Sequence, residues 1–249
     1  MTETAPFKAR CLLFATLVIS ICSIVYELII GSLSAYLLGN SVLQFSLTIG
    51  LYLFAMGAGS YASRYLERDL FDALAAIEIA VGVIGGFSAL GLFLCYIYTN
   101  VYPLAMYLAI LSVGFLVGME IPLLVRIFEQ SGQSLRSGVA NLFAFDYLGG
   151  LLGSLLFPLV LLPALGYVAV AFFTGVLNLC AAVAIVFRYR ERLASFSNAS
   201  GNLLYGIGRF VGADFRRQFG DGPPGRRALP RPDRAEPPNA LSENRNHAP

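Results

Sequence analysis

Four acidic side chains stand within stretches that are otherwise apolar: Glu27, Glu78, Glu120 and Asp146. A charged residue at the centre of a membrane helix costs about 3 kcal/mol on insertion scales, so such residues usually face a bundle interior and serve a function. No Lys or Arg lies at a comparable depth to neutralise them. The chemistry that this pattern indicates is the binding of a cationic amine or of protons.

The composition indicates a polytopic membrane protein. The chain has 249 residues, of which 57% are hydrophobic and only 13% charged, and its mean hydropathy is +0.71. A soluble domain of this length carries about 25% charged residues. The single histidine, His247, lies near the end of the chain, and the four cysteines lack CxxC spacing. We therefore expect no catalytic residue, no metal site and no cofactor of this chain's own.

Six apolar segments are long enough to cross a bilayer, for which a helix needs about 20 residues. They run near 11–38, 44–63, 70–98, 102–125, 138–162 and 166–187. The sequence thus predicts an all-α, six-helix transmembrane bundle within residues 1–192. Residues 193–249 are predicted to form a largely disordered tail, because from about Gly220 they are rich in Pro, Arg, Asn and Asp.

The basic residues predict the orientation of the bundle. Lys and Arg precede the first span and follow the second, fourth and sixth spans, whereas the three other loops contain neither. By the positive-inside rule, both termini are then cytoplasmic.

This orientation converts sequence position into depth. Glu78 and Asp146 lie eight residues into outward-going helices, about 12 Å from the cytoplasmic edge. Glu120 lies six residues before the arginine that follows its span, at about 9 Å. Three acids are therefore expected in one layer. Glu27, about 25 Å beyond the basic residues near the N-terminus, is expected to be separate and near the outer side.

Pro122 adds a predicted helix kink beside Glu120. Proline cannot donate a backbone hydrogen bond and clashes with the carbonyl of Gly118, which would free carbonyl oxygens for a cation. A structural alternative stays open: each acid is protonated and hydrogen-bonded to a Tyr, Ser or Asn. In a further alternative, the side chain of Arg126 extends toward the acidic layer and neutralises one of the acids.

Three runs resemble one family. They are VYELIIGSLSAYLLGNSVLQFSLTIGLYLFAMGAGSYASRY from Val25, GMEIPLLVRI from Gly118 and FDYLGGLLGSLLFPLVLLPALG from Phe145. Together they are similar to the membrane domain of bacterial membrane-integrated spermidine synthase-like proteins, over residues 11–192. Glu27, Glu120 and Asp146 fall within these segments, and Glu78 lies outside them. The resemblance implies a role in polyamine biosynthesis and a place in the bacterial inner membrane.

Such proteins normally continue into a cytoplasmic Rossmann-like domain, which uses decarboxylated S-adenosylmethionine to transfer an aminopropyl group to putrescine. We expect this chain to be truncated before that domain and inactive in this transfer by itself. Residues 241–248 can be encoded by a nucleotide run that reads Tyr-Gln-Arg-Ile-Val-Ile-Thr one base over, similar to the opening strand of that domain. The tail is therefore expected to be an out-of-frame product, which sequencing of the DNA tests.

Three functions stay open at this point. The acids bind a cationic amine or a proton within a spermidine synthase-like membrane domain, or they serve a stand-alone cation- or proton-coupled transporter, or the chain is a passive membrane anchor. The expected partners are the lipid bilayer, a polyamine and a second copy of the chain. Nucleic acid is not expected, because the arginines of the tail are separated by prolines and lack neighbouring aromatic residues.

Overall fold

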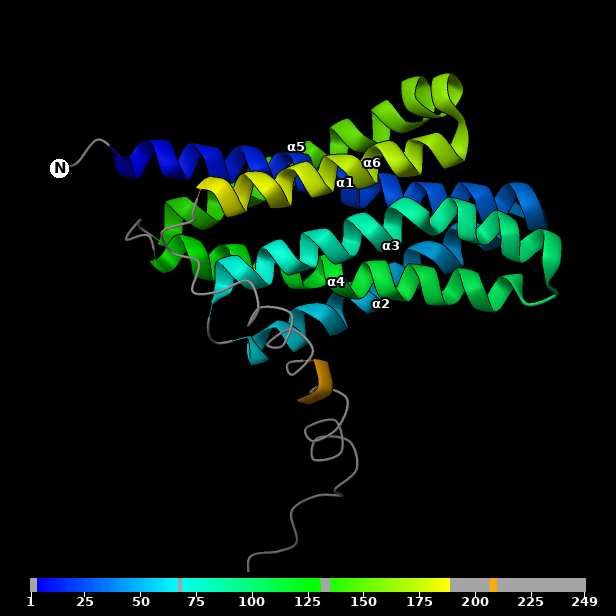
Figure 1. Ribbon diagram of the computed structural model, residues 1–249, viewed down its shortest axis with the longest axis horizontal. Helices are drawn as coiled ribbons and strands as arrows, with labels where there is room; N and C mark the ends of the chain where they lie inside the picture. The colour runs from blue at the N-terminus through cyan, green and yellow to red at the C-terminus, as the bar shows by residue number, and fades with distance from the viewer. Residues whose placement is uncertain (1–3, 67–68, 131–134, 189–206, 210–249) are drawn as a thin grey trace, which may run out of the picture.

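Six long helices form one bundle (Figure 1). The computed structural model describes residues 4–66, 69–130, 135–188 and 207–209. The helices are α1 (Thr4–Leu38), α2 (Ser41–Ala62), α3 (Leu70–Tyr98), α4 (Tyr102–Gln130), α5 (Leu135–Leu156) and α6 (Leu162–Arg188). The predicted all-helical, six-helix fold is confirmed for this part of the chain. The predicted disorder of 193–249 falls almost wholly outside the described residues.

The helices are long and apolar enough to cross a membrane. Five helical stretches qualify: Cys11–Leu38, Ser41–Tyr65, Leu70–Tyr98, Tyr102–Gln130 and Ser137–Phe187. The last stretch contains both α5 and α6, joined by the π-helical turn η2 (Phe157–Leu161), and folds back on itself (Figure 1). Large apolar side chains are exposed on the outside, as in Val42 at 80% and Leu159 at 72%. This surface is compatible with a multi-pass membrane protein.

The fold-back between α5 and α6 depends on Gly166. Its φ of 74° and ψ of 169° lie in a region that only glycine occupies readily. The sequence predicted a loop over 163–165, but the chain stays helical there and reverses at this single residue. The reversal turns α6 back along α1, against which both α5 and α6 pack.

Gly166→Ala is expected to lower the free energy of unfolding by about 1–3 kcal/mol, through backbone strain alone. A Cβ at this position would meet no heavy atom within 4 Å, so packing is not at issue. The matched control is Gly91→Ala in α3, where a Cβ would also meet open space but φ is helical. Denaturant unfolding in bicelles compares the two variants, and equal stabilities would contradict the argument.

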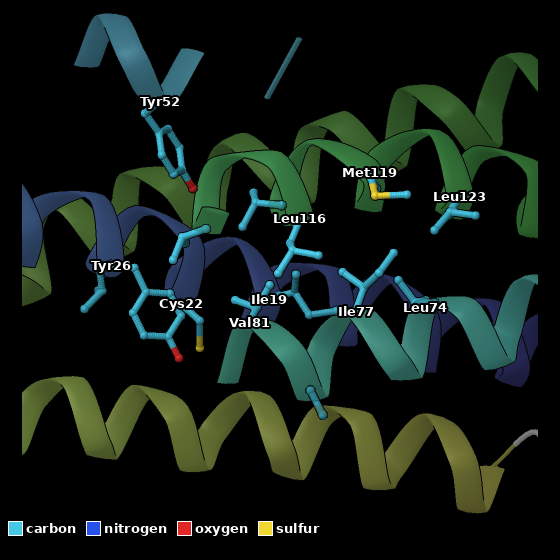
Figure 2. Packing of buried hydrophobic residues seen from close by; sticks show 14 of the residues in the cluster. Ile19, Cys22, Tyr26, Tyr52, Leu74, Ile77, Val81, Leu116, Met119 and Leu123 are labelled. Carbon is cyan, nitrogen blue, oxygen red and sulfur yellow. The ribbon is translucent and has the colours of Figure 1, made fainter. Parts of the chain in front are cut away.

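Helix α1 lies at the centre of the bundle and packs against each of the other five helices. Figure 2 shows its side chains Ile19, Cys22 and Tyr26 among residues of α3 and α4. All three side chains are essentially inaccessible. No residue of α1 between Ala15 and Ala35 is exposed, so a polar group in this part of the helix faces another helix, which positions the site described next.

Candidate functional site

A pocket of about 370 Å³ lies between α1, α2, α4 and α5. Three of the four predicted acids line it: Glu27 from α1, Glu120 from α4 and Asp146 from α5. The remaining lining residues are Ser20, Ser23, Ile24, Tyr52, Leu53, Met56, Val117, Ile121, Tyr147 and Gly150. The volume is within the range of about 300–1,000 Å³ that is typical of small-molecule pockets.

The prediction that Glu27 is separate from the other acids is wrong. The hydroxyl of Ser20 donates to the backbone carbonyl of Asp146 at 2.6 Å, so these two residues share a level. Glu27 is seven residues further along α1, about 10 Å higher. It nevertheless lines the same pocket, because the pocket follows α1 for two turns.

The carboxyl group of Glu120 interacts electrostatically with those of Glu78 and Asp146, so these three predicted acids lie near one another. Glu120 is 2% exposed, and its Oε1 has no hydrogen-bond partner in the described part of the chain. This buried oxygen, on a residue that lines the pocket, is available to a ligand.

Glu78 belongs to the layer but is not among the residues that line the pocket. It is fully buried in α3, and neither of its carboxyl oxygens has a hydrogen-bond partner among the described residues. The thiol of Cys22 on α1 interacts electrostatically with both Glu78 and Glu120. Of the four predicted acids, three therefore line the pocket and Glu78 does not.

Tyr52 lies between the two acidic levels of the pocket. Its hydroxyl donates to the backbone carbonyl of Ser23 at 3.3 Å, and the side chain is 3% exposed. Its phenol is within electrostatic reach of Glu27, Glu120 and Asp146. Figure 2 shows the ring pointing from α2 toward α1.

Pro122 and Arg126 follow Glu120 on α4. Helix α4 runs unbroken through Pro122, and the kink stays a prediction. The guanidinium of Arg126 donates to the carbonyls of Leu66 and Ser63 at 2.8 and 2.6 Å, away from the pocket lining. The alternative in which Arg126 neutralises one of the acids is therefore wrong. Among the described residues, none that lines the pocket is Lys, Arg or His.

The pocket opens between α2 and α5. Helices α1 and α4 each pack against both of them, whereas α2 and α5 barely touch each other. The lining residues Leu53 of α2 and Tyr147 of α5 are 60% and 72% exposed. These side chains flank the entrance.

Sequence reasoning missed the neutral polar residues of the site. Ser20, Ser23 and Glu27 are spaced i, i+3 and i+7, which places them on one face of a helix. That spacing was the available signal. Tyr52 gave no such signal, because a lone tyrosine in an apolar helix is common.

Comparisons with known proteins agree with the predicted resemblance. The chain is 43% identical over 204 residues to polyamine aminopropyltransferase 2 of Ralstonia nicotianae, covering 81% of this chain and 40% of the relative. It is 44% identical over 167 residues to a polyamine aminopropyltransferase of Leptospira interrogans, covering 67% and 33%. Polyamine aminopropyltransferase 1 of Streptomyces coelicolor is 40% identical over 204 residues, with coverage of 81% and 38%.

These identities confirm the resemblance to spermidine synthase-like proteins. The chain spans two fifths or less of the length of these relatives. No family model matches the chain. No solved structure is similar to it.

Proposed function

We propose, from the homology to polyamine aminopropyltransferases, that this chain is the membrane domain of a spermidine synthase-like protein and that its acidic pocket binds a cationic amine. The observation that carries the proposal is the pocket itself. Three carboxyl groups from three helices line it, and no basic side chain in the described residues does. Aminopropyl transfer from decarboxylated S-adenosylmethionine would belong to a part outside this chain.

An ammonium group suits the chemistry of the lining. Carboxylates that share a site repel each other, and a cation between them removes that repulsion. An ammonium also supplies up to three hydrogen-bond donors. Glu120 offers an unpartnered oxygen to accept one of them. A ligand that is both charged and rich in donors therefore fits better than a neutral one.

The ends of the bundle support the proposed orientation. Arg126 of α4 donates to Ser63 and Leu66 beyond the end of α2, so these helix ends lie together. By the positive-inside rule, this basic end faces the cytoplasm of a bacterial inner membrane. Glu120 lies only six residues from Arg126. Glu120 would thus lie toward the cytoplasmic side of the membrane, where the synthase domain of such proteins is expected.

Glu120→Gln is expected to weaken binding of radiolabelled 1,4-diaminobutane to the purified chain in lipid nanodiscs about tenfold or more. It removes a charge-assisted hydrogen bond, which contributes about 1.5–3 kcal/mol. Glu78→Gln is the matched comparison, because it removes an equally buried carboxyl group that does not line the pocket and should therefore weaken binding less than Glu120→Gln does.

Absence of saturable binding to the unmodified chain would contradict the proposal, as would an equal loss in both variants. Uptake of the amine into liposomes, lost in Glu120→Gln, would instead favour the stand-alone transporter.

A further inference from the structure

A second group of buried polar side chains lies where α1, α3 and α6 pack together, outside the pocket lining. Its members are Tyr26 of α1, Glu78 of α3 and Asn178 of α6, and each is at most 1% exposed. The Tyr26 hydroxyl, both carboxyl oxygens of Glu78 and the amide oxygen of Asn178 have no hydrogen-bond partner among the described residues. Buried polar atoms are nearly always paired, so these four atoms require an explanation.

The packing of α3 against its neighbours brings the three side chains together. A Cβ on Gly82 would lie 3.3 Å from the Cβ of Asn178, and Gly82 is one turn from Glu78 on the same face of α3. A Cβ on Gly85 would overlap the ring of Tyr26. The Tyr26 phenol is within electrostatic reach of Glu78, and Figure 2 shows this side chain pointing from α1 toward α6. Two glycines of α3 thus let a tyrosine and an asparagine approach the buried carboxyl group.

No basic side chain of the described residues interacts electrostatically with Glu78. Helix α1 faces it with Cys22 and Tyr26, and α4 faces it with Glu120. Helix α6 carries no acidic or basic residue before Arg188, at which it ends. An ionised carboxylate that is sealed from water and has no basic partner is far less favourable than a neutral acid, so such groups generally bind a proton.

The hydrogen-bonding capacity of the unpartnered atoms indicates what is missing. The oxygens of an ionised Glu78 and of the Asn178 amide can only accept, whereas the Tyr26 hydroxyl supplies one O–H. A proton on Glu78 converts one carboxyl oxygen into a donor, so that two donors face two acceptors and the charge is removed. A hard metal cation such as Mg²⁺ needs about six oxygen ligands. Among the described residues, no three acidic, histidine or cysteine side chains are gathered in a way that could hold a metal ion.

We propose that Glu78 binds a proton and that Tyr26, protonated Glu78 and Asn178 form a hydrogen-bonded chain across α1, α3 and α6, a proton-binding site separate from the acidic pocket. The Tyr26 hydroxyl donates to one carboxyl oxygen. The other carboxyl oxygen donates its proton to the amide oxygen of Asn178, directly or through a water molecule. This inference does not depend on what the pocket binds. A neutral Glu78 also removes one source of repulsion from the carboxyl group of Glu120, with which it interacts.

Infrared difference spectroscopy of the purified chain in nanodiscs tests the site at a mildly alkaline pH, at which an ordinary glutamate is ionised. A protonated carboxylic acid has a C=O stretching band that an ionised carboxylate lacks. The spectrum of Glu78→Gln is expected to lack one such band that the unmodified protein has. Glu129→Gln is the matched control, because Glu129 is exposed near the end of α4 and its substitution should remove no such band. If Glu78→Gln removes none either, Glu78 is ionised and the proposal is wrong.

Two further variants test the partners in protein that retains Glu78. Tyr26→Phe and Asn178→Leu each remove one hydrogen bond to the acid, so each should move its C=O band to a higher frequency. Thr174→Val is the matched control on α6, because the buried Thr174 hydroxyl donates to the carbonyl of Val170 in its own helix, and the band should stay in place. A band that neither variant moves would overturn the proposed chain of hydrogen bonds. A band that appears only after sodium is removed would overturn it as well, because a metal cation would then hold the site in place of the proton.

Discussion

Gly118→Ala is expected to lower the free energy of unfolding by about 1–3 kcal/mol, the cost that is typical of overpacking. A Cβ at Gly118 would overlap backbone atoms of Met56 on α2. Backbone atoms cannot rotate away, so α2 and α4 would have to separate. Gly59 on α2 meets the backbone of Phe115 in the same way from the other side. Small residues at such contacts let membrane helices approach closely.

The measurement is the midpoint of SDS-induced unfolding in mixed micelles, followed by circular dichroism. Gly57→Ala on α2 is the matched control, since a Cβ there would meet no heavy atom within 4 Å. We expect the control to be neutral or slightly stabilising, because Ala is the better helix former by about 1 kcal/mol. Equal midpoints for the two variants would show that the helices do not pack as closely as described.

The same substitution should also weaken amine binding. Gly118 is two residues from Glu120, and Met56 itself lines the pocket. Separating the two helices moves Glu120 away from Tyr52 and widens the pocket. Close helix packing is thus what sets the distance between the lining groups.

Hydropathy alone predicted the helices well, because a bilayer-length apolar stretch can satisfy its backbone only as a helix. The third span was predicted at 70–98, and α3 has these bounds. Helix α4 continues to Gln130, five residues past the predicted end. Hydropathy marks where the apolar surface ends, whereas a helix continues into polar residues with good helix propensity.

The site was predicted less well, because sequence position gives the depth of a residue but not the helix face on which it lies. Counting residues placed Glu78, Glu120 and Asp146 at one depth, and their interactions agree. Counting residues could not show that Glu78 is absent from the pocket lining or that Glu27 extends the pocket by two turns. Those facts depend on which helices are neighbours, which is decided by close contacts between distant segments.

Arg126→Ala is expected to lower the free energy of unfolding by about 2–3 kcal/mol. The Arg126 guanidinium donates to the carbonyls of Leu66 and Ser63 and to the Ser63 hydroxyl, the last at 3.0 Å. The Ser63 carbonyl would keep the N–H of Leu66 as a donor at 3.1 Å, but the Leu66 carbonyl, which lies beyond the end of the helix, would lose its guanidinium donor. The same unfolding measurement in bicelles checks the value.

Two further variants sharpen this test. Arg126→Lys keeps the charge but loses the planar fork that reaches two carbonyls at once, so it should recover only part of the stability. Arg64→Ala is the control from the same end of the bundle. Arg64 lies over the ring of Tyr61 at 3.7 Å and donates to the hydroxyl of Tyr65, which are exposed contacts of about 0.5–1 kcal/mol each. A loss as large in Arg64→Ala would mean that basic charge at this end matters, rather than the hydrogen bonds of Arg126.

Arg126→Ala should leave the affinity of the folded protein for 1,4-diaminobutane unchanged within about twofold. Its guanidinium is held by carbonyls of the turn after α2 and is not part of the pocket lining. If Arg126 instead served as the counter-charge of Glu120, removing it would strengthen binding of a cation. Tighter diamine binding by Arg126→Ala would therefore contradict the proposal that the carboxyl groups of the pocket are paired by a cationic ligand and not by a basic residue of the chain.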